Sequence, residues 1–360
     1  MTEEVTLLKG NEAIAIAAIR YGVDGYFGYP ITPQSEIIET LMQEAPWKTT
    51  GMVVLQAESE VSAINMVYGG AGCGKYVMTS SSSPGVSLKQ EGISYLAGAE
   101  LPCLIVNVQR GGPGLGTIQP SQADYFQTVK GGGHGDYKLI TLAPNSVQEM
   151  ADFVALGFDL AFKYRVPSII LADGIIGQMM EKVRLPEYRR RRTEQEIREQ
   201  CPWATLGKSG GKPHLVTSIE LEPERMERHN EKLQARYRTI EENEVRCQEC
   251  YCEDADYLLV AFGSASRICL KAAEIAREHG VKAGLVRPIT LWPFPSKILS
   301  RYADRVKGIL TVEYNAGQMV EDVRLAVNGK TPVEYYGRLG GVVPTPDNVW
   351  EALNKKIVRS

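Results

Sequence analysis

The chain has 360 residues, of which 44% are hydrophobic and 23% are charged, as in an ordinary globular protein large enough for two domains. Its formal net charge of -3 gives no general electrostatic reason to bind nucleic acid or acidic lipid. No apolar run approaches the roughly 18–20 residues of a membrane helix. The acidic start MTEEVTLLKG is unlike a signal peptide, so we expect a cytoplasmic protein without membrane contact.

Short apolar runs alternate with longer helical patterns through the first half of the chain. The predicted strands are Gly25–Tyr29, Met52–Leu55, Tyr76–Thr79, Cys103–Val108, Leu139–Leu142 and Ser168–Ala172. The predicted helices between them are Gly10–Tyr21, Ser35–Glu44, Ser59–Gly69, Val86–Gly98 and Ser146–Lys163. Because strands that are buried on both faces are continuously apolar, this alternation predicts a parallel sheet covered by helices on both sides.

The composition changes over residues 184–254, where we expect a linker. The basic run Tyr188–Arg192 is interpreted as a solvated segment, with an anionic docking site as the alternative. A loop is expected at Ser209–Pro213. Glu224–Glu244 is charged throughout, which predicts an exposed helix.

A second α/β unit is expected over residues 255–360. Its predicted strands are Tyr257–Phe262, Lys282–Val286, Gly308–Val312 and Val333–Tyr336, and its predicted helices are Ser264–Gly280 and Pro346–Lys355. The whole pattern therefore predicts an α/β protein with two domains, 1–183 and 255–360, each a mostly parallel sheet with helices on both faces.

Two segments resemble phosphate or metal motifs but lack required residues. Gly69–Lys75 nearly spells a P-loop, but Tyr76 stands where the magnesium-binding hydroxyl should be. The segment also leads from a helix into a strand, so its glycines are interpreted as a helix stop. Asp173-Gly174 follows a strand, yet the Gly-Asp-Gly triplet and later Asn pair of a magnesium–diphosphate motif are missing.

The seven cysteines are an odd number in a chain without a signal sequence, which argues against a disulfide framework. Cys247, Cys250 and Cys252 have the spacing of a partial zinc or iron–sulfur site. A fourth ligand is not evident, so they are interpreted as incidental thiols in a loop and no metal site is predicted. His134 lies in a glycine-rich loop and is either exposed or turned toward a ligand; the sequence leaves both open.

Four polar segments follow predicted strands, and the carboxyl ends of parallel strands are where α/β sheets place their sites. They are Gly28–Ser35, Gln56–Glu60, Thr79–Gly85 and Asn107–Gly112. Each alone has an ordinary explanation, since Glu, Ser and Thr commonly stabilise helix starts. Together they supply a carboxylate, an arginine and hydroxyls at one sheet edge, as a small carboxylate substrate would require.

These segments resemble the 2-oxoacid:ferredoxin oxidoreductases in order and spacing, and the resemblance covers nearly the whole chain. It is carried by Tyr29–Pro33, Glu60 within Gln-Ala-Glu-Ser-Glu, the Ser-rich turn before Gly85, Gln109–Pro113, Val286–Pro295 and Glu313–Gln318. It implies a pyrimidine-binding thiamine diphosphate domain followed by a transketolase-C-like domain.

The resemblance also implies partners. In such enzymes the thiamine diphosphate lies between two subunits, so a beta-type subunit would supply the missing magnesium and diphosphate site. Iron–sulfur clusters would lie in partner subunits, among them ferredoxin-like and gamma-type subunits. Electrons would pass to ferredoxin, and coenzyme A would take the acyl group.

Site residues follow from the same resemblance. Glu60 matches the catalytic glutamate that hydrogen-bonds N1′ of the aminopyrimidine, with Pro30 and Ser82 also at the cofactor. Thr32 and Arg110 match positions that hold the substrate, and a guanidinium can bind a carboxylate bidentately. Leu115 and Thr117 would border the substrate.

The substrate is expected to be branched-chain, namely 2-oxoisovalerate (3-methyl-2-oxobutanoate). Gly114–Tyr125 is similar to that group and lacks the Leu-Pro-Thr-Lys-like segment of the 2-oxoglutarate enzymes, which is the alternative. Two other classes stay open: an iron–sulfur electron-transfer subunit built around Cys247, Cys250 and Cys252, and a non-catalytic scaffold.

Overall fold

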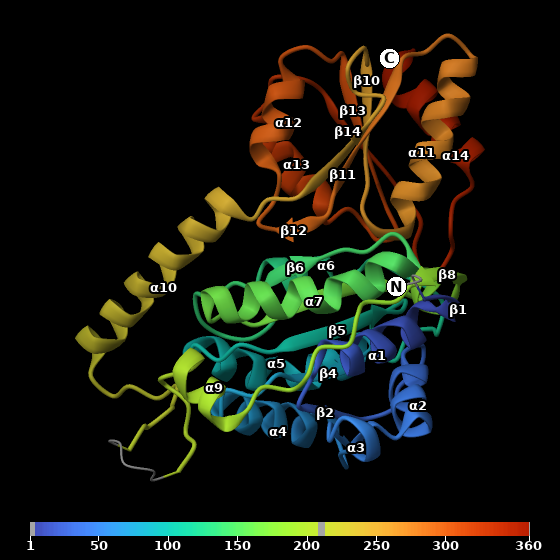
Figure 1. Cartoon of the computed structure of the whole chain (residues 1–360). Helices are drawn as coiled ribbons and strands as arrows, with labels where there is room; N and C mark the ends of the chain where they lie inside the picture. Colours follow the sequence, from blue (N-terminus) through green and yellow to red (C-terminus); the bar gives the residue numbers. More distant parts are fainter. Residues whose placement is uncertain (1–3, 208–212, 360) are drawn as a thin grey trace.

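The computed structural model describes residues 4–207 and 213–359 and contains two stacked α/β units (Figure 1). Figure 1 shows the first unit, blue to green, below the second, orange to red, with the long helix α10 (Pro223–Asn243) at their side. The α/β class predicted from the sequence is confirmed. Over the described ranges no helix is long and apolar enough to cross a membrane. Residues Ser209–Lys212 of the expected loop lie outside the described residues.

The first unit is built on a seven-stranded sheet in the order β12-β6-β7-β5-β4-β2-β3. All neighbouring strands in it are parallel except β12, which is antiparallel to β6. Six strands match the predicted ones to within two residues. Their bounds are β2 Gly25–Gly28, β3 Val53–Gln56, β4 Val77–Ser81, β5 Leu104–Gln109, β6 Ile140–Leu142 and β7 Ser168–Asp173, with β12 at Thr290–Trp292.

Helices cover both faces of this sheet, as an apolar parallel sheet requires. One face packs against α1 (Gly10–Tyr21), α2 (Ser35–Glu44) and α7 (Val147–Tyr164). The other packs against α4 (Glu60–Gly72) and α5 (Ser83–Gly98). The short helices are α3 Pro46–Thr49, α6 Tyr125–Val129, α8 Gly174–Gln178 and α9 Glu194–Gln200, and β1 Val5–Lys9 forms an antiparallel pair with β8 Met180–Arg184.

The glycines of the P-loop-like segment end a helix, as predicted. The helix α4 continues to Gly72, three residues beyond the predicted end, and Gly74 then takes a positive φ of 69°. Strand β4 begins three residues later. The order helix, turn, strand is the reverse of a phosphate-binding loop.

The second unit has a five-stranded sheet in the order β14-β13-β10-β11-β9. Only β9 is antiparallel to its neighbour. The bounds are β9 Cys247–Cys250, β10 Tyr257–Val260, β11 Ala283–Pro288, β13 Gly308–Glu313 and β14 Val333–Gly337. The helices are α11 Gly263–Glu278, α12 Ser296–Ala303, α13 Met319–Val327 and α14 Pro346–Leu353, followed by a π-turn at Asn354–Val358.

The expectation of a loop at the three neighbouring cysteines is wrong for Cys247 and Cys250, which begin and end the edge strand β9, whereas Cys252 lies in the loop after it. The strand pairs with β11, with Cys250 opposite Leu285 and Cys247 opposite Pro288. This pairing is long-range in the sequence, so nothing in the local pattern Cys-Gln-Glu-Cys indicated it.

The two units share one apolar core instead of meeting at a hinge. A single buried cluster includes Leu160 and Leu171 of the first unit together with Leu258 and Ile309 of the second. The strand β12 comes from the second half of the chain and completes the sheet of the first. Burial of apolar surface across the junction therefore holds the units in one arrangement.

Two buried polar contacts also join the units. Arg287 of β11 is 2% exposed and donates from both guanidinium nitrogens to the carboxylate of Glu149 on α7. Asp173, at the end of β7, accepts from the backbone N–H of Ser264 at 3.0 Å and from its hydroxyl at 2.7 Å. The same aspartate caps α8. Burial raises the pKa of Asp173, and the hydrogen bonds from Ser264 oppose this rise.

The helix α10 is mostly exposed, as predicted, but one buried carboxylate fixes it to the first unit. Glu100 accepts hydrogen bonds from Lys232 and Arg236 on successive turns of α10. Burial alone would raise the pKa of Glu100, but these two cations outweigh it and lower the pKa to about 2. The charged segment is thus a docked helix and not a free linker.

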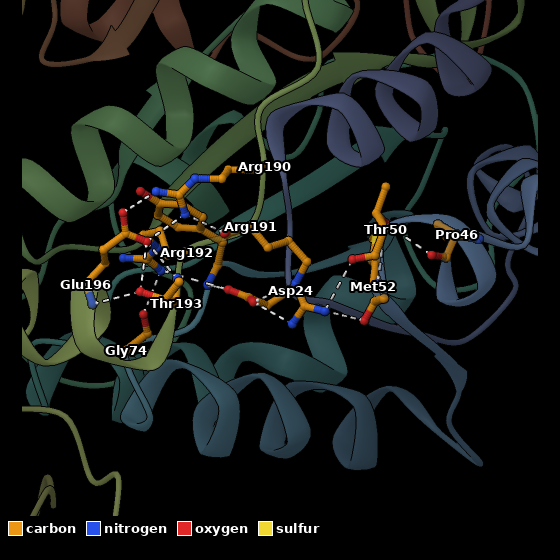
Figure 2. Close-up of polar contacts among 12 residues, drawn as sticks. Asp24, Pro46, Thr50, Met52, Gly74, Arg190, Arg191, Arg192, Thr193 and Glu196 are labelled. Atoms are coloured by element: carbon orange, nitrogen blue, oxygen red, sulfur yellow. Dashed lines mark hydrogen bonds and ion pairs between the residues drawn. The ribbon is translucent and has the colours of Figure 1, made fainter.

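The basic run folds back across the first unit as a strap, shown in Figure 2. Arg191 donates to a carboxylate oxygen of Asp24 at 2.7 Å, and its other nitrogen reaches the backbone carbonyls of Thr50 and Gly51. Arg192 donates to the Gly74 carbonyl at 2.7 Å. The interpretation as a solvated segment is therefore wrong for this half of the run, because the buried Asp24 binds both arginines.

Arg192 also stacks on an aromatic side chain. Its guanidinium lies 3.5 Å from the ring centroid of Tyr76, a cation–π geometry. Arg190, by contrast, forms an ion pair with Glu196 and is largely exposed. The strap thus has a partly buried half, Arg191 and Arg192, which binds Asp24, and an exposed half at Arg190, which does not.

We predict that Asp24→Asn destabilises the chain by about 3 kcal/mol, because it leaves two partly buried guanidinium groups without their counter-charge. Asparagine keeps an acceptor for the Tyr76 N–H, which Asp24 now binds at 2.9 Å, so the change is mainly one of charge. Urea unfolding measures the difference. Arg190→Ala is the matched control and should cost at most about 1 kcal/mol, as for an exposed ion pair. Equal midpoints for the two variants would contradict this account of the strap.

Candidate active site

The four polar segments do meet at one edge of the first sheet. They begin at the carboxyl ends of β2, β3, β4 and β5, which are parallel and adjacent in the sheet. The edge is the position where α/β sheets place binding sites. The prediction that these segments share one sheet edge is confirmed.

The loop after β2 is held by its backbone carbonyls, which leaves its side chains available. Gln34 donates to the Tyr29 carbonyl at 3.1 Å, and Arg110 donates to the Thr32 carbonyl at 3.0 Å. Asn11 donates to the Pro33 carbonyl at 2.7 Å. The Thr32 side chain is exposed at this edge, beside the half-buried Pro30.

A buried chain of hydrogen bonds connects the same loop to the sheet. The hydroxyl of Tyr26 on β2 lies 2.6 Å from that of Ser80 on β4, and Ser80 donates to Gln34 Oε1 at 2.5 Å. A Cβ at Gly28 would lie 2.3 Å from the Tyr26 hydroxyl, so only glycine leaves room for this chain. The loop is therefore fixed before any ligand binds.

Glu60 opens α4 and is buried, with 6% of its surface exposed. The helix starts there because the Ser59 hydroxyl accepts from the Ser62 N–H at 3.2 Å. The Glu60 carboxylate accepts no hydrogen bond from the described part of the chain. It lies against the first turn of α5, where a Cβ at Gly85 would come within 2.7 Å of Glu60 Oε1. A buried carboxylate without a donor is a strong indication that a donor arrives with a ligand.

Two hydroxyls beside Glu60 are also buried without partners. Ser81 ends β4 and Ser82 precedes α5, and neither Oγ finds a hydrogen-bond partner among the described residues. A Cβ at Gly85 would lie 2.1 Å from the Ser81 Oγ, so this hydroxyl lies at the same crossing as Glu60. Ser82, predicted at the cofactor, lies next to it in the chain.

Arg110 lies on the other side of the first turn of α5. It is 8% exposed, and its two terminal nitrogens donate to the carbonyls of Thr32 and Leu115. The Ser83 hydroxyl links it to α5, accepting from the Arg110 N–H at 3.0 Å. Its Nε is buried without a partner. The structure thus brings Thr32 and Arg110 together, although through the threonine backbone.

The loop after Arg110 is closed by its own hydrogen bonds. Gly111 donates to the Gln119 carbonyl at 2.9 Å, and Thr117 donates to the Gly111 carbonyl at 2.8 Å. The half-buried Thr117 turns its methyl group toward Gly111. Leu115 is 80% exposed, so in this chain alone it lines no enclosed pocket.

A cleft of about 520 Å³ opens beside Arg110, between the two units. Its first wall comes from the start of α5 and the loop after β5, and its second from the second unit; the lining includes Ser83, Ser87, Gly111–Gly114, Asp124, Tyr314–Ala316, Gln318 and Leu339–Gly340. The motif segment Glu313–Gln318 therefore reaches the same site as Arg110, although 200 residues separate them in the sequence.

Sequence reasoning missed Asp124 in this cleft. Its carboxylate accepts from Ser83 at 2.6 Å and from Asn107 at 2.9 Å. Burial raises the pKa of Asp124, and both hydrogen bonds oppose that change. The sequence feature that could have indicated Asp124 is the presence of an aspartate in the loop that follows Arg110.

Lys89 was also missed. It lies on α5 in the spacing Val86, Lys89, Ile93, Leu96, where the other three side chains belong to the apolar core. A lysine in the middle of an apolar helical stripe was the signal for a buried charge.

His134 and the neighbouring cysteines lie away from this edge. His134 lines a separate cavity of about 320 Å³ with Tyr95, Met226 and His229, between α5 and α10. Burial raises the pKa of Cys247 to about 12 and that of Cys252 to about 11. Within the described ranges, no three His, Cys, Asp or Glu side chains are grouped so as to hold a metal ion.

Two family models together match most of the chain. The model described as pyruvate flavodoxin/ferredoxin oxidoreductase, thiamine diphosphate binding, matches residues 16–248. The model of pyruvate:ferredoxin oxidoreductase core domain II matches residues 255–349. The junction between the two models falls just after β9.

Curated relatives match over nearly their full length. The ketoisovalerate oxidoreductase subunit VorB of Methanothermobacter marburgensis is 52% identical, over 93% of this chain and 93% of its own length. The 2-oxoglutarate synthase subunit KorA of the same organism is 37% identical, over 99% of both chains.

Two solved structures share the fold. The 2-oxoglutarate:ferredoxin oxidoreductase of Magnetococcus marinus, solved with 2-oxoglutarate, coenzyme A and succinyl-CoA, matches with a TM-score of 0.85 at 26% identity. The match covers 98% of this chain and 65% of that one. A split gene transketolase matches with a TM-score of 0.60 at 15% identity over 97% of both chains, a likeness of fold alone.

The buried glutamate, the arginine and the cleft thus occur in a chain whose two units both match models of one enzyme family. The chain belongs to the 2-oxoacid:ferredoxin oxidoreductases, as an enzyme subunit with a thiamine diphosphate-binding domain.

Proposed function

We propose that this chain supplies the aminopyrimidine half of a thiamine diphosphate site in an enzyme that oxidatively decarboxylates 2-oxoisovalerate. The observation that carries the proposal is Glu60, a buried carboxylate without a hydrogen-bond donor at the carboxyl edge of the sheet. Residues 1–183 would form the cofactor domain and residues 255–360 the transketolase-C-like domain.

The residues at this edge fit one half of the cofactor. Glu60 would accept a hydrogen bond from N1′ of the aminopyrimidine, with Pro30 and the unpartnered Ser82 hydroxyl beside the ring. When bound, thiamine diphosphate supplies the thiazolium carbon that takes up the keto carbon and holds the electron pair left by carbon dioxide. Glu60 would hold the proton at N1′, and the fixed loop before α2 would exclude water.

The diphosphate half of the cofactor would be bound by a partner subunit. The aspartate that follows a strand, Asp173, is fully engaged in capping α8 and binding Ser264, so it is not available to magnesium. We assign the magnesium and diphosphate site to a beta-type subunit. Iron–sulfur clusters would lie in ferredoxin-like and gamma-type subunits, which pass electrons to ferredoxin while coenzyme A takes the acyl group.

An exposed apolar surface next to Glu60 supports a docking subunit. Large apolar side chains are exposed on the loop after β2 (Tyr29), on the edge strand β3 (Val53 and Leu55), and on α4 and α5 (Val61, Met66 and Leu88). Exposed apolar groups of this extent commonly mark a protein interface. Because Val61 follows Glu60 directly, a subunit bound there would also cover the cofactor.

For the substrate we propose roles for four residues. The free N–H groups of Arg110 and the Thr32 hydroxyl would bind the carboxylate and keto oxygen, at the mouth of the cleft between the units. Leu115 and Thr117 would border the side chain once the partner covers the exposed loop. The 52% identity to a ketoisovalerate oxidoreductase subunit supports the branched-chain substrate.

The alternative substrate is 2-oxoglutarate, which the more distant KorA relatives support. The segment Gly111–Gln122 contains no lysine or arginine, so no cation in it could receive a second carboxylate. An unpaired buried carboxylate is costly, which favours the branched-chain acid. An electron-transfer or scaffold role receives less support, since the match to models of an enzyme family and the buried Glu60 at the sheet edge count against it.

We predict that the isolated chain binds thiamine diphosphate weakly and decarboxylates no 2-oxo acid, because it lacks a diphosphate anchor. Adding the co-purified partner subunits should restore tight binding and turnover. Calorimetry with thiamine diphosphate and release of labelled carbon dioxide measure the two properties. Robust turnover by this polypeptide alone would refute the split site.

We predict that Glu60→Gln lowers kcat of the assembled complex by roughly 10²–10⁴-fold, the usual contribution of a positioned acid or base. Glutamine keeps the size of the side chain but cannot hold the proton at N1′, so folding and subunit assembly should be unchanged. Glu58→Gln is the matched control, because Glu58 is exposed and two residues away. If Glu58→Gln were the inactive variant, the catalytic role would pass to Glu58.

We predict that Arg110→Lys raises KM for every 2-oxo acid and lowers kcat/KM by roughly 10- to 150-fold, the value of about 1.5–3 kcal/mol for a charge-assisted contact. The order of preference among 2-oxoisovalerate, 2-oxoisocaproate, pyruvate and 2-oxoglutarate should not change, because all share the carboxylate. Wild-type complex should accept the branched acids within about 200-fold of one another. A clear preference for 2-oxoglutarate would overturn the branched-chain assignment and leave the cofactor proposal intact.

A further inference from the structure

Lys89 is a fully buried lysine to which the proposed chemistry gives no role. It lies on α5 with 0% of its surface exposed, between Val86 and Ile93, which both belong to the apolar core. Its ammonium donates to the Thr79 hydroxyl at 3.1 Å. No carboxylate of the described residues reaches ion-pair distance of it. A buried ammonium with one neutral partner costs several kcal/mol, so its presence needs an explanation.

The explanation lies one helical turn away. Lys89 follows Gly85 by four residues, so both lie on the same face of α5. That face is where the Glu60 carboxylate packs, since a Cβ at Gly85 would come within 2.7 Å of Glu60 Oε1. The buried ammonium side chain and the Glu60 carboxylate therefore lie against neighbouring turns of one face of α5.

The other charged and titratable groups around Lys89 are few. The strands behind it, β4 (VMTSS) and β5 (LIVNVQ), contain no ionisable side chain. The helix α4 contributes Glu60 and Tyr68, and the loop near the end of α5 contributes His134 and Tyr137. Asp124 touches the opposite end of α5 through Ser83.

Of these groups, Glu60 is the one that acts on the ionisation of Lys89. Burial lowers the pKa of Lys89 to about 8, and the charge of Glu60 limits that fall. The ammonium therefore keeps most of its charge at pH 7.

We propose that Lys89 is a positioning residue for the reaction: the buried counter-charge that keeps Glu60 ionised once cofactor and partner subunit have removed water from the site. The inference rests on the proposed function of Glu60. Covering a carboxylate favours its protonated form, and a fixed cation in the same low-dielectric region opposes this change. Lys89 touches neither substrate nor cofactor, so it acts through Glu60 alone.

The test is Lys89→Met in the assembled complex. Methionine fills a similar volume, and replacing a poorly paired buried charge by an apolar side chain is commonly neutral or stabilising, so thermal stability should stay the same or rise. We expect the acid limb of the kcat/KM profile to move up by roughly one pH unit, with kcat lowered and KM for the 2-oxo acid little changed. Lys355→Met, on the exposed last turns of the chain, is the control and should change neither property.

A spectroscopic measurement gives a readout other than activity. In pH-difference infrared spectra of the complex without thiamine diphosphate, the protonated carboxyl band that Glu60→Gln abolishes belongs to Glu60. In Lys89→Met this band should persist to a pH higher by roughly one unit. Thr79→Val is the second variant: it removes the hydrogen-bond acceptor of the ammonium, favours neutral Lys89, and should shift the band in the same direction by less.

The outcomes separate this inference from the function on which it rests. An active wild type, an inactive Glu60→Gln, and a Lys89→Met variant with unchanged pH profile and infrared titration would overturn the role of Lys89 alone. A Glu60→Gln variant with wild-type turnover would instead remove the proposed function. If Lys89→Met fails to assemble, an unshifted carboxyl band in Thr79→Val overturns the inference.

Discussion

Glu60 and Gly85 meet where the first turns of α4 and α5 cross, and the crossing leaves no room for a side chain at position 85. The two helices follow β3 and β4, which lie on either side of β2 in the sheet, so both helices begin at its carboxyl edge. This contact fixes the carboxylate on one side of α5, while Ser83 fixes Arg110 on the other. The first turn of α5 therefore positions the Glu60 carboxylate and the Arg110 side chain relative to each other.

The same edge is closed from above by the second unit. The motif Val286–Pro295 explains how, because it contains both Arg287, which binds Glu149, and the strand β12, which completes the first sheet. Asp173, at the end of β7 in the first unit, also holds the second unit by binding Ser264. A family motif that looks like a site motif is thus a joint between the units, and the cleft at Arg110 lies between the two units that it joins.

The sequence predicted the parts of the fold that depend on neighbouring residues. The parallel strands, their covering helices and the polar segments at strand ends all follow from local periodicity, and the bounds of these strands and helices agree with the structure to within three residues. The edge strands β9 and β12 did not follow, because each is antiparallel and pairs with a strand far along the chain. Arg191 and Arg192 looked solvated for the same reason, since their carboxylate lies at Asp24. At the site, residue type indicated Glu60 and Arg110, but the burial of Lys89 and the contacts of Asp124 depend on packing that no single segment encodes.

The pairing of β12 with β6 also has a consequence during synthesis of the chain. The first unit can assemble strands β2 to β7 while the ribosome is still producing the segment after residue 184. Strand β6 then remains an unpaired edge until β12, which ends at Trp292, has been synthesised. Unpaired edges attract other strands, and nascent chains are exposed to such contacts. Here the open edge is only three residues long and α10 is made before β12. The short edge of β6 and the earlier synthesis of α10 would both limit misassembly until β12 has been synthesised.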